Sequence, residues 1–182
     1  LAKKAKKVIS FEIDGRLLPI LSETLADYPN VEIINNDILK VDVDKIIAEK
    51  MSDCEKIMVV ANLPYYITTP ILTHLIENTE KIDGYVVMMQ KEVANRLNAK
   101  VGTKDYNSLT ILLNYYTDVE YLFTVPKKVF VPAPNVESAV VKIMTKETRE
   151  FETDAKFFKF VRSCFVQRRK TLLNNLISSY GK

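Results

Sequence analysis

The chain has 182 residues, 47% hydrophobic and 27% charged, a balance that excludes a disordered or fibrous protein. Its four glycines are scattered, which excludes a glycine-rich phosphate loop, and no apolar run is long enough to cross a membrane. The net charge of +3 is too small to identify a partner. A single histidine and two cysteines without a C-x-x-C pair argue against a zinc site and favour a reducing, cytoplasmic compartment.

The first 90 residues alternate predicted strands with predicted helices. Short β-branched and apolar runs predict strands over 8–13, 31–34, 57–61 and 85–89. Apolar residues at helical spacing predict helices near 17–25, 43–51, 70–76 and 93–97. This alternation is typical of an α/β fold in which crossover helices join the strands of a parallel sheet.

Polar side chains stand where three of these strands end. They are Glu12, Asp37 and Asn62. In parallel sheets the carboxyl ends of the strands line the ligand crevice, so two acids and an amide there would suit a polar cofactor. Polar residues at strand ends also occur simply because turns meet solvent, and this pattern alone leaves both interpretations open.

The pattern changes after residue 109. Residues 109–116 fit a helix or a strand, whereas 121–125 and 138–143 favour strands. Pro132 and Pro134, between those two strands, predict a stiff extended loop. Charged residues 145–154 suggest a linker, and 157–176 predict an amphipathic helix or helix pair with Arg162 and Arg169 on its polar face.

The most informative segment is Asn62-Leu63-Pro64-Tyr65, directly after the strand predicted over 57–61. An exocyclic base amine is a poor nucleophile, and two acceptors, an Asn oxygen and a backbone carbonyl, would hold its two N–H groups. Pro64 would fix the direction of the Leu63 carbonyl, and Tyr65 would offer a flat face for an extruded base. The alternative is an ordinary turn with Tyr65 covering the core.

Three segments resemble the ribosomal RNA adenine N6,N6-dimethyltransferase family: 62–70, 130–140 and 165–176. The third favours the small-subunit branch over the related antibiotic-resistance methylases of large-subunit RNA. The resemblance implies a Rossmann-like S-adenosylmethionine-dependent methyltransferase domain over 1–148, then a linker and the start of a helical RNA-binding domain over 149–182. It further implies a cytoplasmic, metal-free monomer that dimethylates two adjacent adenines in a hairpin loop of small-subunit ribosomal RNA, within the immature small subunit during ribosome biogenesis.

The same resemblance assigns residues to the cofactor. It implies that Glu12 binds the ribose hydroxyls of S-adenosylmethionine, in agreement with the rule that an acid at this strand end takes the ribose. It also implies that Asp37 accepts from the adenine amine of the cofactor, that the Ile38 N–H lies nearby, and that Asn62 borders the methionine end.

For the target base, the resemblance implies that Asn62 and the Leu63 carbonyl hold the amine and that Tyr65 stacks on the ring. Phe130 is the expected second wall of that pocket, or else an ordinary core aromatic beside a proline-rich loop.

A run of three cations, Arg168, Arg169 and Lys170, would neutralise RNA phosphates, or would form a solvated helix face.

The family also has a first strand and a glycine-rich loop that this sequence lacks. We therefore expect a fragment, inactive alone, whose missing strand would lie between those ending at Glu12 and Asn62. The alternatives are a non-catalytic RNA- or ribosome-binding fragment, a large-subunit RNA adenine methyltransferase, or a methyltransferase acting on DNA adenine or a glutamine amide.

Overall fold

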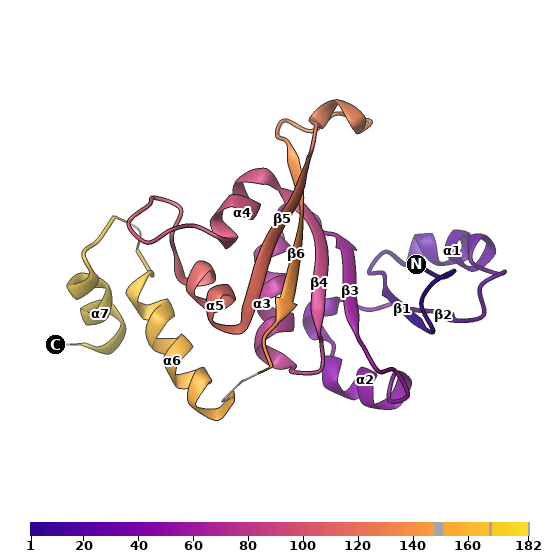
Figure 1. The fold of residues 1–182 in the computed structure, drawn as a ribbon, viewed down its shortest axis with the longest axis horizontal. Helices are drawn as coiled ribbons and strands as arrows, with labels where there is room; N and C mark the ends of the chain where they lie inside the picture. Colours follow the sequence, from indigo (N-terminus) through magenta and orange to yellow (C-terminus); the bar gives the residue numbers. More distant parts are fainter. Residues whose placement is uncertain (148–150, 168, 182) are drawn as a thin grey trace. The chain divides into compact units, whose positions relative to one another are not determined.

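The computed structural model describes residues 1–147, 151–167 and 169–181. The chain forms two compact units (Figure 1). Unit 1 comprises Leu1–Ile57 and Pro70–Lys81, and unit 2 comprises Met58–Thr69 and Ile82–Lys182. The division therefore runs through the region 1–148 that the sequence pattern groups together.

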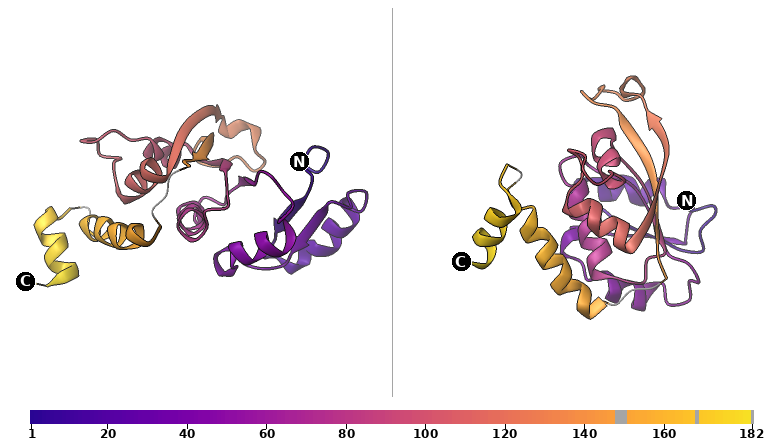
Figure 2. Two further views of the ribbon diagram at one scale, coloured as in Figure 1. Left: turned by 60° about the horizontal axis from the view of Figure 1, so that its bottom comes forward. Right: turned by 60° about the vertical axis from the view of Figure 1, so that its left-hand side comes forward.

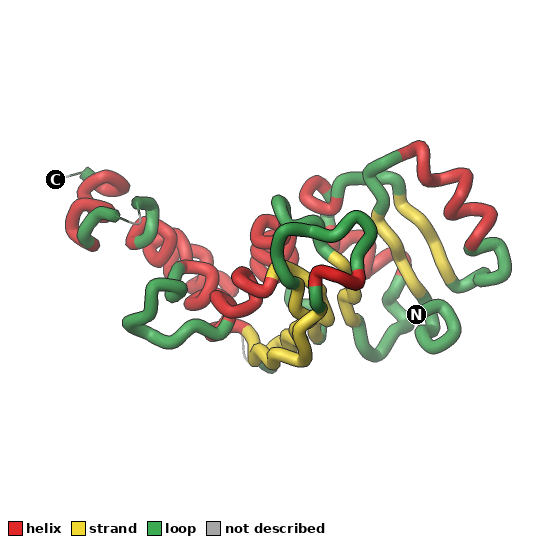
Figure 3. The backbone as a smooth tube through the Cα atoms, turned by 90° about the horizontal axis from the view of Figure 1, so that it is seen from above, coloured by secondary structure: helices red, strands yellow, loops and turns green. Residues whose placement is uncertain are grey.

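Unit 1 is built around one pair of parallel strands. It contains β1 (Val8–Phe11), η1 (Gly15–Leu17), α1 (Leu18–Thr24), β2 (Val31–Ile34), η2 (Ile38–Lys40), α2 (Val43–Lys50) and most of α3 (Thr68–Asn78). The strands lie side by side, from Val8 opposite Val31 to Phe11 opposite Ile34 (Figure 2; yellow in Figure 3). The first strand ends two residues earlier than predicted, so Glu12 follows it directly. Every residue of both strands is half-buried, as expected for a ladder with two open edges.

Helices α2 and α3 supply most of the buried residues of unit 1. The Asp42 side chain accepts a hydrogen bond from the Lys45 N–H and so caps the start of α2. Val43 and Ile47 of α2 are buried, as are Ile71, Leu72, Leu75 and Ile76 of α3. The Thr79 hydroxyl donates to the Asp44 carboxylate at 2.5 Å, which ties α2 to the residues that follow α3.

Unit 2 contains a four-stranded mixed sheet. Its strands are β3 (Met58–Asn62), β4 (Gly84–Gln90), β5 (Thr117–Val125) and β6 (Ser138–Thr145), in the order β3-β4-β6-β5. β3 and β4 are parallel, whereas β6 is antiparallel to both of its neighbours. The parallel pairing predicted for the first 90 residues is therefore confirmed for β1 with β2 and for β3 with β4. Among the described residues no ladder joins the two sheets.

The core of unit 2 lies along β4 and β6. Burial alternates along both strands, with Tyr85, Val87, Met89, Ala139, Val141 and Ile143 fully buried. This alternation follows from the two-residue period of a strand. Helix α4 (Lys91–Leu97) packs against β4, β5 and β6, and α5 (Ser108–Tyr116) packs against α4 and β5.

Residues 109–116, whose apolar pattern fits either a helix or a strand, lie in helix α5. The Asn107 side chain accepts from the N–H groups of Leu109 and Thr110, while the Thr110 hydroxyl accepts from the Asn107 N–H. This reciprocal capping satisfies backbone donors that a helix start otherwise leaves unpaired. From β5 the chain passes through η3 (Lys127–Val129) and the proline-rich loop into β6, at the tip of a long hairpin (Figure 1).

Two helices end the chain, α6 (Phe151–Cys164) and α7 (Leu172–Tyr180), which confirms the predicted helix pair. The linker predicted over 145–154 is wrong at both ends, because β6 includes Thr145 and α6 begins at Phe151. Residues 148–150 lie outside the described residues. None of the described helices combines the length and apolar character needed to cross a membrane.

Helix α6 docks through aromatic rings. Phe158 is 4% exposed, and its ring centroid lies 5.5 Å from that of Tyr115 and 5.1 Å from that of Tyr116. Tyr116 is buried as well, at 3% exposed, whereas Tyr115 is 44% exposed. Arg169 lies in the turn between α6 and α7, so the prediction that it shares a helix face with Arg162 is wrong.

Candidate functional site

In unit 1, two acids follow the carboxyl ends of adjacent strands. The Glu12 N–H continues the ladder by donating to the Ile34 carbonyl at 3.1 Å. Asp37 follows β2 by three residues and precedes η2. Because β1 and β2 are parallel and in register, Glu12 and Asp37 stand at the same edge of this sheet.

The Glu12 carboxylate is held by the turn that follows it. One oxygen, Oε1, accepts from the Asp14 N–H at 2.7 Å, and the residue is half-buried. Asp14 is in turn fixed by the Arg16 guanidinium at 2.6 Å, which lowers the pKa of the Asp14 carboxyl. The second Glu12 oxygen accepts no hydrogen bond from the described residues, so it is available to a hydroxyl group.

Asp37 presents an acceptor next to a free donor. Its Oδ1 accepts from the Leu39 N–H at 3.0 Å and caps η2, while Oδ2 has no hydrogen-bond partner among the described residues. The neighbouring Ile38 N–H is likewise unpaired there. A carboxylate oxygen beside a backbone N–H matches the amine and the adjacent ring nitrogen of an adenine. The residues present therefore fit the adenosine part of S-adenosylmethionine.

In unit 2, Asn62 and Leu63 provide two unpaired acceptors where β3 ends. Asn62 is the last residue of β3 and is exposed, and its side-chain amide makes no hydrogen bond to the described residues. The Leu63 N–H donates to the Met88 carbonyl at 3.1 Å and its side chain is buried. The Leu63 carbonyl, by contrast, accepts nothing from the described residues. The two groups that the sequence assigns to a target amine are both free.

Tyr65 lies in the turn between β3 and α3. The Pro64 carbonyl accepts from the Ile67 N–H at 3.1 Å and from the Thr68 hydroxyl at 3.0 Å, which closes the turn. The Tyr65 ring is half-buried, and its hydroxyl lies 2.6 Å from Ser138 Oγ at the start of β6. The sequence pattern did not single out Ser138, although it lies within the segment 130–140 that carries the family resemblance.

The remaining predicted residues lie in other places. Phe130 is half-buried in the loop after η3, and no ring contact joins it to Tyr65 within the described parts of the chain. Arg169 and Lys170 are exposed in the turn before α7, and Arg168 lies outside the described residues. Glu12, Asp37 and Ile38 belong to unit 1, whereas Asn62, Leu63, Tyr65 and Phe130 belong to unit 2.

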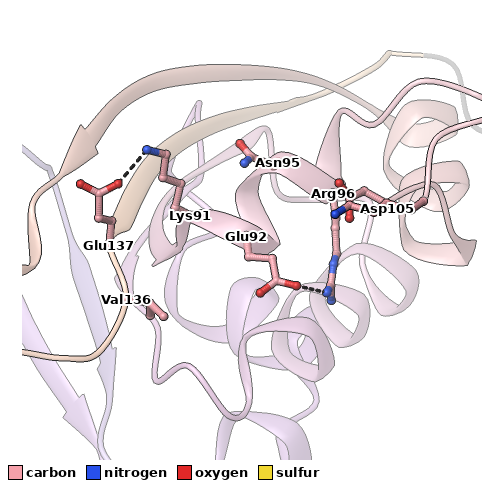
Figure 4. A pocket seen from close by; sticks show the side chains of 8 residues that line it. Lys91, Glu92, Asn95, Arg96, Asp105, Val136 and Glu137 are labelled. Carbon is pink, nitrogen blue, oxygen red and sulfur yellow. Dashed lines mark hydrogen bonds and ion pairs between the residues drawn. The ribbon is translucent and has the colours of Figure 1, made fainter.

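Sequence reasoning also missed a polar hollow of about 570 Å³ in unit 2 (Figure 4). It is lined by α4 and by residues near 104–105 and 136–137. Of the lining residues, Lys91 pairs with Glu137 at 2.7 Å, which raises the pKa of Lys91, and Arg96 pairs with Glu92. The sequence signals for these groups are that Lys91 directly follows β4 and that Glu92 and Arg96 are four residues apart, the spacing of an ion pair on a helix.

The chain was compared with known proteins. The family model described as ribosomal RNA adenine dimethylase matches residues 1–182. A relative from Staphylococcus haemolyticus, named ribosomal RNA small subunit methyltransferase A, is 61% identical over 177 residues, which are 96% of this chain and 60% of the relative. The chain thus spans about 60% of the length of the curated relatives it matches.

Two solved structures show the same fold. A dimethyladenosine transferase from Plasmodium falciparum is 30% identical with a TM-score of 0.76, over 94% of this chain and 60% of that one. The 23S rRNA methyltransferase ErmE is 26% identical with a TM-score of 0.71, over 99% and 70%. These likenesses confirm the predicted α/β methyltransferase fold. Because the family model matches from the first residue to the last, the chain belongs to the ribosomal RNA adenine dimethylase family.

Proposed function

We propose that this protein transfers methyl groups from S-adenosylmethionine to N6 of two adjacent adenines in a hairpin loop of small-subunit ribosomal RNA, in the cytoplasm. The observation that carries the proposal is the pair of unpaired acceptors, the Asn62 side chain and the Leu63 carbonyl, beside the Tyr65 ring. The 61%-identical relative is named for the small subunit, which favours that RNA over the large-subunit RNA of ErmE.

The chemistry follows from what the two acceptors do to an amine. An adenine amine shares its lone pair with the ring, which makes it a weak nucleophile. Acceptance of both N–H groups by Asn62 and Leu63 would draw the nitrogen toward a tetrahedral shape and so leave its lone pair free to attack the methyl donor. Tyr65 would hold the extruded base by stacking, which contributes about 1–3 kcal/mol. No general base is required, because the methylated amine loses its extra proton readily.

When bound, S-adenosylmethionine supplies an electrophilic methyl group. On this proposal the free Glu12 oxygen holds the ribose hydroxyls, and Asp37 with the Ile38 N–H holds the adenine. The exposed Arg169 and Lys170 would neutralise phosphates of the RNA, giving binding that weakens as salt is added.

The experiment uses a version of the protein extended to the length of its curated relatives, of which this chain spans about 60%. It replaces Asn62 with alanine and follows labelled methyl transfer to small ribosomal subunits that lack the modification. We expect Asn62→Ala to abolish at least nine-tenths of the transfer, because the amine loses a charge-free acceptor that acts in the transition state. The matched control is Asn114→Ala, which removes an exposed asparagine from α5 and should leave the rate unchanged. Circular dichroism and thermal unfolding establish that both variants fold.

Undiminished dimethyladenosine formation by Asn62→Ala would refute the proposed role. An unvaried protein that binds the RNA but transfers no methyl group would instead support a non-catalytic RNA-binding function. Transfer to large-subunit RNA alone would contradict the choice of substrate.

A further inference from the structure

One hydrogen bond joins the turn that carries the proposed stacking residue to the start of β6, an inner strand of the sheet in unit 2. The Tyr65 hydroxyl lies 2.6 Å from Ser138 Oγ, although the two residues are 73 positions apart in the sequence. Either hydroxyl can donate, and a separation of 2.6 Å is short for a hydroxyl pair. The contact therefore connects the exit of β3 with the first residue of β6.

Ser138 is held in place by its burial and by pairing with two neighbouring strands. It is 0% exposed, and its backbone pairs with Gln90 of β4 on one side and with Val125 of β5 on the other. The preceding residue, Glu137, accepts from the Lys91 N–H at 3.0 Å and pairs with the Lys91 ammonium. A side chain on such a strand has little freedom to move, so the position of the Ser138 hydroxyl in unit 2 is well defined.

Tyr65 has far fewer constraints. Its neighbours Pro64 and Tyr66 are exposed, and Tyr66 is 87% exposed. The bond to Ser138 is the only hydrogen bond that the Tyr65 side chain makes to the described residues, and its ring makes no aromatic contact with them. The Ser138 bond therefore fixes the hydroxyl end of the half-buried ring, and no aromatic ring of the described residues stacks on its faces.

We propose that Ser138 is a positioning residue, which fixes the Tyr65 ring in the orientation that receives the target base. This inference rests on the proposed function, because it assigns Tyr65 to stacking. A ring that is already oriented loses less conformational freedom when a base stacks on it, so more of the stacking energy is available to hold the base for transfer.

The test compares Ser138→Ala, Tyr65→Phe and the double variant in methyl transfer to unmodified small subunits, each made in the version extended to the length of the curated relatives. Each single variant removes the same hydrogen bond but keeps an aromatic ring at position 65. We expect each to lower kcat/KM for RNA by about 3- to 10-fold, the effect of one ordinary hydrogen bond, with KM for S-adenosylmethionine unchanged. The double variant should lose no more than either single one, because the shared bond is already gone.

Ser138→Thr keeps a hydroxyl and should restore most of the rate. Should the added methyl group prevent folding at this buried position, Tyr65→Phe and the double variant still decide the question. The matched control is Tyr121→Phe, which removes an equally short hydroxyl contact, 2.6 Å to Thr124 Oγ1, from the same unit. That variant should transfer methyl groups at the unvaried rate.

A second measurement does not depend on catalysis. With tyrosine labelled at Cζ, the Tyr65 resonance should shift in Ser138→Ala and stay in place when Thr124 is replaced by valine. A Ser138→Ala protein with full activity, or single effects that multiply in the double variant, would overturn the positioning role while leaving the proposed function intact. An unvaried protein without transferase activity would refute the proposed function and this role together, even with the resonance shift present.

Discussion

The Lys91 ammonium lies 2.7 Å from the Glu137 carboxylate, and the Lys91 N–H donates to the Glu137 carbonyl at 3.0 Å. The two residues are therefore bonded through both side chain and main chain. These two bonds join the start of α4 to Glu137, the residue that precedes Ser138 at the start of β6. Glu137 raises the pKa of Lys91, chiefly through the side-chain hydrogen bond.

The pH dependence of this pair follows from the direction of that shift. A lysine whose pKa is raised in the folded state stabilises the fold below its unfolded pKa of about 10.4, and this contribution disappears as the pH rises through the folded pKa. We expect Glu137→Gln to lower the pKa of Lys91 toward its ordinary value, measured by NMR titration of the lysine Cε signals. Glu49→Gln, which affects a looser pair with Lys45 at 3.9 Å, should leave Lys91 unchanged. An unshifted Lys91 in Glu137→Gln would contradict the assignment.

Gly84 begins β4 where another backbone approaches closely. A Cβ built on this residue would lie 2.8 Å from the Ile143 carbonyl oxygen and 2.7 Å from Met144 Sδ. The methionine side chain can move, but the carbonyl belongs to the ladder between β4 and β6. We predict that Gly84→Ala lowers the free energy of unfolding by about 1–3 kcal/mol, measured by urea denaturation.

Gly15→Ala is the control for this prediction. A Cβ at that position meets only Asn35 Oδ1, at an ordinary 3.7 Å, so the change should be close to neutral. Equal losses from the two substitutions would show that the approach of β6 to Gly84 is not the cause.

Glu12 and Asp37 follow the strands of unit 1, and we expect the affinity for S-adenosylmethionine to depend on the charge of each carboxylate. Calorimetric titration with S-adenosylmethionine should give binding that Glu12→Gln and Asp37→Asn each weaken by about 10-fold or more, because a hydrogen bond to a charged acceptor is stronger than one to a neutral acceptor. Asp27 is an exposed acid of the same unit that makes no ion pair with the described residues, so Asp27→Asn should bind normally. Unchanged affinity in both acid variants would remove the basis for placing the adenosine there.

Much of the fold could be predicted from the sequence because its signals are local. The apolar run 31–34 has the length and β-branching of a strand, and it is a strand with those same bounds. Apolar spacing likewise predicted α2 and the helix pair at the end of the chain. Segment 109–116 was ambiguous by periodicity, and the Asn107 cap, another local signal, resolves it as a helix.

The candidate site likewise has residues that could be selected from the sequence and contacts that could not. Glu12, Asp37 and the Asn62–Tyr65 segment could be selected from the sequence, because a polar residue at a strand end and a proline-containing turn are features of neighbouring residues. The Ser138 contact with Tyr65 and the Lys91–Glu137 link could not, because they exist only once β6 inserts antiparallel between β4 and β5. Strand pairing depends on contacts between residues far apart in the chain, and no short-range pattern encodes which strand will become the neighbour.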